Sequence, residues 1–339
     1  MDKIAGCGLE VSAGELVVAL EDQRVQRYAN TAAGHRKLLE TLTRGGRRVR
    51  VVLEATGMYG LDVALLLSAA AGVEVMIANP RAVRDFAKAM MQRSKNDPLD
   101  AVVLWEYATR MPFREWQRPS QNRLALWGIT RRIRALTEQC RGEKNRQHAA
   151  GISQTTPACV RRDIARNLRA QQQAIKKLRQ EAQKCVAAEV QLQQEYRLLV
   201  SVPGIAESSA LQILGELAML PADRDIRQWV AYAGLDPSEH QSGTSVRKPS
   251  RLNRSGNRYL RQALYMPALT AIRWEPHLRG FYEHLVQRGK RKKQALLAVA
   301  RKLLHAIYGM FRTNCIYQGQ LVFRLNPTEQ NPVLAQQFS

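Results

Sequence analysis

The first 110 residues alternate short apolar, β-branched runs with stretches of helical periodicity, and this alternation limits the fold more than any other feature of the chain. Strand-like runs are expected within residues 3–29, at 48–54 and at 73–78. Helices are expected at about 31–42, 59–71, 81–91 and 97–110. The order β-β-β-α-β-α-β-α-α predicts a mixed α/β domain whose sheet begins antiparallel and continues parallel.

Four carboxylates lie where a metal-dependent nuclease would hold them. Glu10 and Glu54 each close a strand-like run, and the carboxyl ends of strands are the usual ligand side of an open α/β sheet. Asp97 and Asp100 flank Pro98 at an expected helix start, with Asp97 as the cap. A simple capping motif is the alternative for that pair. Oxygen ligands from several elements suit Mg²⁺, with Mn²⁺ as the alternative ion, and paired ions can assist phosphodiester cleavage.

The charge of the chain points to a phosphate-rich partner. Among 339 residues there are 52 Lys and Arg against 29 Asp and Glu, which gives a formal net charge of +23. The stretch from Gln241 to Arg312 carries 16 Lys or Arg and only two Glu. Such a surface favours nucleic acid and predicts binding that weakens with salt.

Several other classes of protein are disfavoured. The five cysteines are scattered without a Cys-x-x-Cys pair, which argues against a zinc site and against a disulfide framework. The sequence shows no signal peptide and no apolar stretch of the roughly 20 residues that a membrane span needs. We therefore expect a cytoplasmic protein without a membrane partner.

Two long polar helices are expected after a linker at residues 112–119. Apolar residues step by three and four from Leu126 to Cys140, and a second seam runs from Ile164 to Leu192, interrupted by Gln171 and Glu189. An antiparallel hairpin within one chain and an intermolecular coiled coil both fit this pattern. The resulting division is an α/β domain over 1–115, a helical hairpin over 116–195, a mostly helical unit over 196–325 and a loose tail over 326–339.

A tight turn at Pro203–Gly204 separates two apolar helical stretches in the third unit. Backbone N–H groups at the start of the second helix can hold a nucleic-acid phosphate without reading its sequence, and we assign Gly204 to such a contact. A plain corner between helices is the alternative.

A glycine and small hydroxyl side chains stand next to a basic stretch around Ser242. A serine hydroxyl in such a place can attack a phosphate when its surroundings activate it, and arginines can neutralise the phosphate charge. Local sequence alone favours a loop that contacts phosphate without doing chemistry. The basic residues assigned to nucleic-acid binding are Arg247, Lys248, Arg251, Arg254, Arg258, Lys290, Arg291, Lys292 and Lys293. The aromatic residues Tyr259, Tyr265 and Trp274 are expected in the core.

Six short stretches, spread over nearly the whole chain, resemble one known family. They are Leu53–Gly57, Lys95–Ala101, Val202–Ile205, Ala233–Leu235, Ser242–Arg247 and Leu264–Ala268. The chain resembles the DEDD-type insertion-sequence transposases of the insertion sequence one-ten family, which are bridge-RNA-guided recombinases and include pilin-gene invertases. The resemblance implies a RuvC-like, RNase H-type N-terminal domain, a coiled-coil insertion and a mostly helical C-terminal transposase domain.

The resemblance also implies a mechanism and partners. Glu54, Asp97 and Asp100 match three of the four family acids, and Ser242 matches the catalytic serine. The serine would form a phosphoserine link while Mg²⁺ on the acids stabilises the transition state. Donor and target double-stranded DNA, a structured guide RNA encoded by the element, and a homodimer or homotetramer with acids and serine from different protomers are the implied partners.

The family's first acid is Asp, and this chain has Glu10, whose side chain is one methylene longer. Mg²⁺ holds its ligands at about 2.0–2.1 Å and tolerates such a change poorly. Two alternatives to the recombinase therefore stay open. One is a metal-dependent junction nuclease that uses Ser242 only for binding, and the other is a nucleic-acid-binding protein with impaired catalysis.

Overall fold

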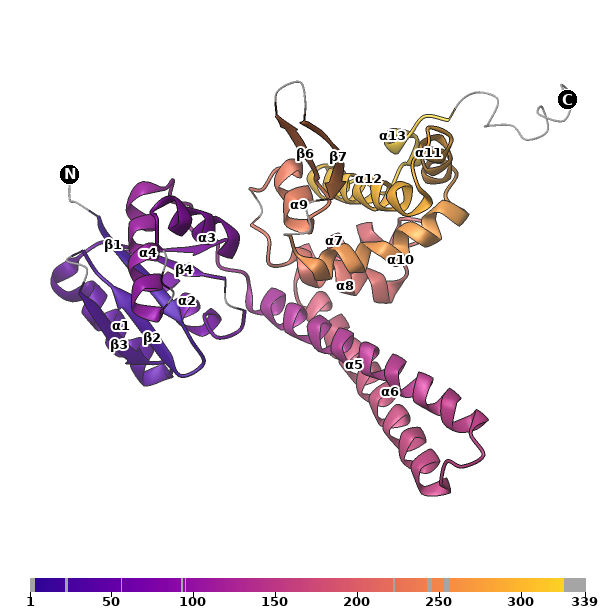
Figure 1. The fold of residues 1–339 in the computed structure, drawn as a ribbon, viewed down its shortest axis with the longest axis horizontal. Helices are drawn as coiled ribbons and strands as arrows, with labels where there is room; N and C mark the ends of the chain where they lie inside the picture. The colour runs from indigo at the N-terminus through magenta and orange to yellow at the C-terminus, as the bar shows by residue number, and fades with distance from the viewer. Residues whose placement is uncertain are drawn as a thin grey trace, which may run out of the picture. The chain divides into compact units, whose positions relative to one another are not determined.

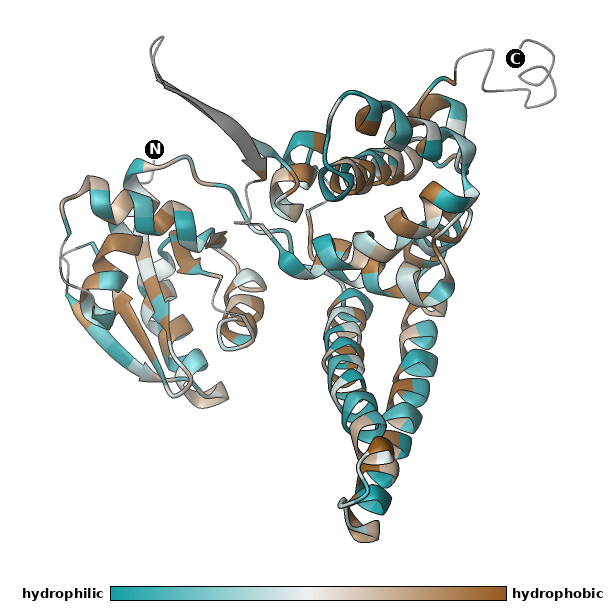
Figure 2. Cartoon of the chain, turned by 45° about the vertical axis from the view of Figure 1, so that its right-hand side comes forward, coloured by the Kyte–Doolittle hydropathy of each residue, from teal (hydrophilic) through white to brown (hydrophobic). Residues whose placement is uncertain are grey.

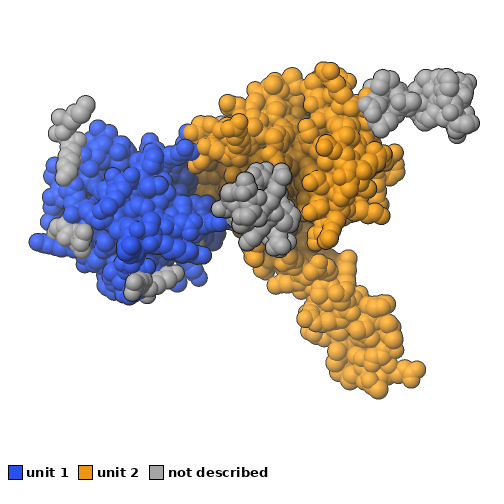
Figure 3. Space-filling view, turned by 45° about the horizontal axis from the view of Figure 1, so that its top comes forward, with its two compact units in different colours: residues 1–118 blue, residues 119–339 orange. Residues whose placement is uncertain are grey.

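The computed structural model describes residues 4–21, 24–55, 57–92, 94, 96–221, 223–242, 246–252 and 256–325, with the backbone alone for 238–242 and 246–251. The chain divides into two compact units, residues 1–118 and residues 119–339 (Figure 3). The expected helical hairpin belongs to the second unit together with the C-terminal helices. The expected tail at 326–339 lies outside the described residues.

The first unit is built on a five-stranded mixed sheet with the strand order β3-β2-β1-β4-β5 (Figure 1). The strands are β1 (Ala5–Val11), β2 (Glu15–Ala19), β3 (Val25–Ala29), β4 (Val49–Glu54) and β5 (Val73–Ala78). β1 and β3 both run antiparallel to β2, whereas β4 is parallel to β1 and to β5. The predicted element order, with its antiparallel start and parallel continuation, is confirmed.

Helices pack on both faces of this sheet. They are α1 (Ala32–Thr43), α2 (Leu61–Ser68), α3 (Pro80–Ala89) and α4 (Asp97–Arg110), with a short 3₁₀ turn at Arg44–Gly46. Buried residues of α1 and α2 share a core with Cys7, Leu9 and Val51, whereas α3 and α4 pack against Val52 and Ala78. Because successive strand residues point to opposite faces, the even-numbered positions of β1 and β4 face α4.

The expected linker at residues 112–119 is not helical, but part of it is held against the sheet. The Trp116 N–H donates to the carbonyl oxygen of Val75 at 2.6 Å. The Arg50 guanidinium lies 4.9 Å from the centre of the Phe113 ring. The hydrogen bond from Trp116 occupies a backbone group of the edge strand β5 that would otherwise be open to pairing with another strand.

The second unit is helical except for one β-hairpin among its described residues (Figure 1). Its elements are α5 (Gln121–Ile152), α6 (Ala158–Ala187), α7 (Val190–Val200), α8 (Glu207–Leu217), α9 (Ile226–Ala233), β6 (Pro237–Ser242), β7 (Val246–Leu252), α10 (Arg258–Trp274), α11 (Pro276–Gln287), α12 (Lys292–Thr313) and α13 (Gly319–Val322). The sequence did not predict β6 and β7, because polar and basic residues fill both strands. No described helix is long and apolar enough to cross a membrane.

Helices α5 and α6 form a hairpin within the chain, and Figure 2 shows mostly hydrophilic residues along its outside. The predicted seam is buried between them, with Ile133, Leu136 and Cys140 packed against Leu168 and Ile175. The expected second helix does not continue to residue 192. It ends at Ala187, and α7 starts at Val190, because Glu189 has extended backbone angles and accepts hydrogen bonds from Arg123 and Ser120.

Candidate functional site

Glu10 and Glu54 lie side by side along neighbouring parallel strands. The register pairs Leu9 of β1 with Leu53 of β4, so the next residue on each strand is a glutamate. Both are even-numbered positions on the face that α4 covers. Glu10 precedes the last residue of β1, and Glu54 is the last residue of β4. The sequence prediction that the two acids reach the same edge of the sheet agrees with this register.

Helix α4 runs antiparallel to β1 and brings its first turn to the same edge. A Cβ atom at Gly6 would lie 3.0 Å from Thr109, and one at Gly8 would lie 2.1 Å from the Ala101 carbonyl oxygen. Asp97 is one helical turn before Ala101, a step of about 5.4–6 Å. Glu10 is two residues beyond Gly8, a step of about 6.6–6.8 Å. Along the direction of β1, the start of α4 and Glu10 therefore lie at a similar distance beyond Gly8.

The local structure around Asp97 differs in one respect from the prediction. The cap of α4 is Asn96, whose side chain accepts a hydrogen bond from the Leu99 N–H at 3.0 Å. Asp97 is the first helical residue, and Pro98 fits the first turn as predicted. Because Asn96 satisfies this orphan amide, the Asp97 carboxylate is not needed as a cap. Asp97 is exposed and Asp100 is half-buried, both in the first turn, where the helix dipole favours negative charge.

The types of residue fit a hard divalent cation, since two strands and one helix that reach the same edge of the sheet each carry carboxylates. Within the part of the chain that the structure describes, no three His, Cys, Asp or Glu side chains come close enough to hold an ion. Glu10, Glu54 and Asp100 each take part in a polar or electrostatic interaction in this structure.

Ser242 belongs to the second unit, as the last residue of β6, where its backbone pairs with Val246 of β7. Residues 243–245, which join the strands, lie outside the described residues, and so does Arg254. Arg247, Lys248 and Arg251 are positions along β7. The serine therefore stands at the far end of a two-stranded arm. The sequence predicted a loop around Ser242, and the structure instead places its backbone in a strand.

The two ends of this arm are held together at its base. A Cβ atom at Gly256 would lie 2.3 Å from the Gly234 nitrogen, so only glycine allows this close approach. The Asn257 N–H donates to the Tyr232 carbonyl oxygen at 2.5 Å, and Arg261 donates to the Ala233 carbonyl oxygen at 2.8 Å. The arm thus leaves a fixed base formed by α9 and α10.

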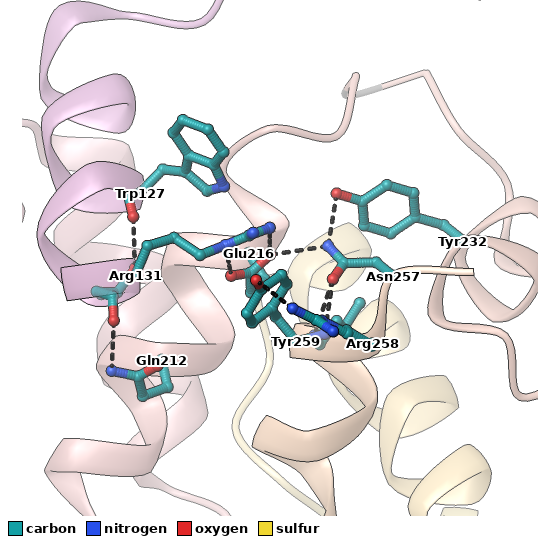
Figure 4. Close-up of polar contacts among 10 residues, drawn as sticks. Trp127, Arg131, Gln212, Glu216, Tyr232, Asn257, Arg258 and Tyr259 are labelled. Atoms are coloured by element: carbon teal, nitrogen blue, oxygen red, sulfur yellow. Dashed lines mark hydrogen bonds and ion pairs between the residues drawn. The ribbon is translucent and has the colours of Figure 1, made fainter. Parts of the chain in front are cut away.

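A buried ion pair between α5 and α8 contacts that base through Asn257 (Figure 4). Arg131 donates to both carboxylate oxygens of Glu216, at 2.5 and 2.8 Å, and Glu216 is 2% exposed. Asn257 donates to Glu216 and to the Tyr232 hydroxyl, each at 2.8 Å. The Arg131 guanidinium also lies 3.6 Å from the centre of the Tyr259 ring. The network joins α5, α8 and the start of α10.

Arg258, assigned to nucleic acid from the sequence, is exposed at the start of α10. It donates to the Tyr259 hydroxyl at 2.9 Å, and this hydrogen bond lowers the pKa of Tyr259. Trp274 was expected in the core, and that prediction is wrong, because the residue is 74% exposed at the end of α10. Tyr259 and Tyr265 are half-buried.

Gly204 has a structural role in the turn between α7 and α8. Its φ is +103°, and a Cβ atom there would lie 2.8 Å from the Ala271 nitrogen in α10. Both features require glycine. The turn is therefore packed against α10, and contact with phosphate stays a prediction.

Lys290, Arg291, Lys292 and Lys293 are all exposed around the start of α12. None of them forms an ion pair with a described acid. Positive charge at a helix N-terminus opposes the helix dipole, at a cost of about 0.3–1 kcal/mol per residue. Their arrangement gives a concentrated positive surface.

The sequence reasoning missed the polar residues that support these sites. Glu216 is a lone acid within the apolar stretch 209–217, and an acid in such a stretch indicates a buried carboxylate that needs a partner. Asn257 follows Gly256 directly before a helix, which is typical of a cap and does not reveal its side-chain partners. The sequence predicted only a helix at about 31–42, and it did not reveal that Asn30, directly before this helix, contacts two loops at the acid-bearing edge.

Comparisons with known proteins agree with these features. Residues 8–157 match the DEDD transposase model of IS110, described as "Transposase", and residues 196–283 match the model described as "Transposase IS116/IS110/IS902 family". The chain is 30% identical over 267 residues to the pilin gene-inverting proteins of Moraxella bovis and Moraxella lacunata, covering 78% of this chain and 81% of each relative. It is 31% identical over 127 residues to the IS110 uncharacterized 43.6 kDa protein of Streptomyces coelicolor, covering 37% of this chain and 30% of that protein.

The first unit carries the mixed sheet expected of a RuvC-like DEDD domain, a type of domain that typically depends on divalent metal ions. The second unit holds the region that matches the other transposase model. The long alignment with the Moraxella proteins spans both. This chain therefore belongs to the IS110 family of transposases, enzymes that cleave DNA and transfer its strands.

Proposed function

We propose that this transposase cuts DNA with the hydroxyl oxygen of Ser242 and with divalent cations, Mg²⁺ or Mn²⁺, held by Glu10, Glu54, Asp97 and Asp100. The pairing of Leu9 with Leu53 is the observation that carries the proposal, since it supports a shared carboxylate site at one edge of the sheet. Cations bound there stabilise negative charge on the phosphate and on the oxygens that attack and leave.

In the proposed step, the Ser242 oxygen forms a bond to phosphorus while the bond to the leaving sugar oxygen breaks. The serine gives up its proton and the leaving oxygen takes one up. The phosphoserine link keeps the strand attached to the protein, so that exchange through a four-way junction and rejoining can follow. Exposed Arg258 and the basic positions of β7 supply positive charge for the phosphate.

Nucleic-acid binding is proposed for the basic residues of the second unit and for the Gly204 turn. The cluster at Lys290–Lys293 supports it, because four cations without described acid partners suit a polyanion. The proposed residues are Gly204, Arg247, Lys248, Arg251, Arg254, Arg258, Lys290, Arg291, Lys292 and Lys293.

The proposed partners are donor and target double-stranded DNA and a structured guide RNA encoded by the element. The functional division is a RuvC-like catalytic domain (1–115), a coiled-coil hairpin (116–195), a transposase domain with the serine (196–325) and a tail (326–339). The acids of one protomer act with the serine of another in a homodimer or homotetramer. The placement of acids and serine in separate compact units supports this sharing.

A denaturing gel of protein, guide RNA and suicide DNA substrates tests the nucleophile. The wild type should form a covalent protein–DNA adduct, Ser242→Ala should form none, and Ser238→Ala, on the same strand, should still form it. No adduct from wild type, or an unchanged adduct from Ser242→Ala, contradicts the proposal. Strand cleavage without an adduct that persists in Ser242→Ala would instead show a junction nuclease that uses metal-bound water.

The Glu10→Asp variant tests whether the longer acid impairs catalysis. Gly8 fixes β1 against α4, so shortening residue 10 withdraws its carboxylate by about one bond length without moving the strand. We expect cleavage to stay equal or to fall. A large rise in cleavage would favour the alternative in which Glu10 has weakened the site.

A further inference from the structure

The side chain of Asn30 connects the two loops that follow the acid-bearing strands. Its Nδ2 donates to the carbonyl oxygen of Ser12 at 2.8 Å and to that of Tyr59 at 3.2 Å. Ser12 lies two residues after Glu10, and Tyr59 lies five residues after Glu54. One amide group therefore joins the loops that follow β1 and β4, at the edge of the sheet where both strands end in a glutamate-bearing segment.

His35 fixes the orientation of this amide. The His35 Nε2 atom lies 2.7 Å from Asn30 Oδ1, and the residue is 7% exposed. Because Asn30 Nδ2 donates to two carbonyl groups, Asn30 Oδ1 must accept the remaining hydrogen bond. The hydrogen-bond partners thus indicate that His35 Nε2 carries the proton. Burial lowers the pKa of His35, while the charge of Asp62 opposes this effect, so the ring is neutral near pH 7.

The helix that carries His35 begins at a fixed place on the sheet. A Cβ atom at Gly34 would lie 1.9 Å from the Ala29 carbonyl oxygen, so only glycine allows α1 to start this close to the end of β3. Thr31 caps the helix by accepting a hydrogen bond from the Gly34 N–H at 3.3 Å. The Asn30 N–H also donates to the Gly14 carbonyl oxygen at 3.0 Å. Asn30 is thus held by its backbone as well as by His35.

We propose that Asn30, oriented by His35, is a positioning residue that keeps the ends of β1 and β4 at the spacing at which Glu10 and Glu54 bind divalent cations. The inference rests on the metal-binding role proposed above for these acids. Adjacent carboxylates repel each other, and a hard cation accepts ligands only within a narrow range of distance. An amide that donates to both following loops opposes their separation before the cation arrives.

A role in stability alone would give a different result, so metal affinity and thermal stability are measured on the same full-length proteins. Mn²⁺ binding is followed by isothermal titration in the absence of nucleic acid, and unfolding by circular dichroism. Asn30→Leu removes both donated bonds at similar volume, and His35→Leu removes the bond that orients the amide. Tyr28→Phe is the matched control, because it also removes two side-chain hydrogen bonds in this unit, to Gln26 and Thr41.

We expect Asn30→Leu to weaken Mn²⁺ binding about 10-fold, in line with the effect of residues that position metal ligands. His35→Leu should shift the Mn²⁺ dissociation constant in the same direction by a smaller factor, and Tyr28→Phe should leave it within about twofold of wild type. Because the two variants disturb the same contact in different ways, His35→Leu still gives the answer when Asn30→Leu does not fold.

Glu54→Gln separates the two possible failures. The positioning role is overturned if Glu54→Gln abolishes Mn²⁺ binding while Asn30→Leu and His35→Leu bind Mn²⁺ like wild type and only unfold at lower temperature. If Glu54→Gln itself binds Mn²⁺ like wild type, the proposed metal site is wrong, and the role of Asn30 in it falls as well.

Discussion

The backbone of α4 approaches β1 so closely that a Cβ atom at Gly8 would lie 2.1 Å from the carbonyl oxygen of Ala101. This contact fixes the position of α4 along β1, and the first turn of α4 carries Asp97 and Asp100. The position of two candidate metal ligands on the helix thus depends on a residue of the sheet that has no side chain.

Gly8→Ala should therefore disturb the first unit and its acid site. The added carbon would meet backbone atoms of α4, which cannot rotate away, so the helix must shift, at a cost of about 1–3 kcal/mol or more. Urea unfolding and Mn²⁺ titration should both show the loss. Gly14→Ala is the control, because a Cβ atom there meets nothing within 4 Å. Equal effects of the two substitutions would contradict the packing argument.

Glu216→Gln should destabilise the second unit. It removes the charge that faces Arg131 in a pair whose Glu216 side chain is 3% exposed. Breaking a buried ion pair costs about 3–5 kcal/mol in the free energy of unfolding. Because the Arg131 side chain keeps 28% exposure, we expect a loss of about 3 kcal/mol, measured by urea titration. Glu138→Gln removes the partner of Arg134 at a site with 62% exposure and should cost less than about 1 kcal/mol. Losses of similar size in both variants would show that burial does not strengthen the contribution of the Arg131–Glu216 pair to stability.

Cys7 should resist alkylation in the folded protein. Burial raises the pKa of the Cys7 thiol to about 12, so almost no reactive thiolate exists at pH 8. Cys159 and Cys315 are exposed. Iodoacetamide at pH 8, followed by peptide mass spectrometry, should modify these two residues first and Cys7 only after denaturation. Early modification of Cys7 would show that the core between the sheet and α1 opens readily.

Replacing Lys290, Arg291, Lys292 and Lys293 with glutamine should weaken nucleic-acid binding and reduce its salt dependence. If each cation contacts one phosphate, the slope of log affinity against log salt should fall by about 3.6, since each contact contributes about 0.9 for duplex DNA. Stability should stay equal or rise, because the substitutions remove positive charge from a helix start. Arg81→Gln with Lys88→Gln is the control, since these exposed cations both lie near Asp85. An unchanged slope would exclude the cluster from the interface.

The sequence predicted the first unit well because its strands are apolar runs of distinctive composition. Strand register is also implied there, since a shift by one residue would move Leu9 and Leu53 out of the core. The hairpin seam was predictable for the same reason, as its apolar spacing repeats over many turns.

The arm formed by β6 and β7 was missed because its residues are polar and basic, so no apolar alternation marked it as a hairpin. The helix break at Glu189 depends on a contact with Arg123, which lies 66 residues earlier in the chain. The network of Arg131, Glu216 and Asn257 and the bridge made by Asn30 likewise join residues distant in sequence. No local pattern contains such contacts, so only the folded chain reveals them.

Mapping of a bound ion by metal-directed cleavage of the polypeptide tests the central claim most directly. Fe²⁺ replaces Mg²⁺ in the full-length protein, and ascorbate with peroxide then generates radicals that cut the chain close to the ion. The account predicts cuts near Glu10, near Glu54 and at residues 97–100, all suppressed by excess Mg²⁺ and by Glu54→Gln. Cuts confined to other parts of the chain, or an unchanged pattern in Glu54→Gln, would contradict a shared metal site at this edge of the sheet.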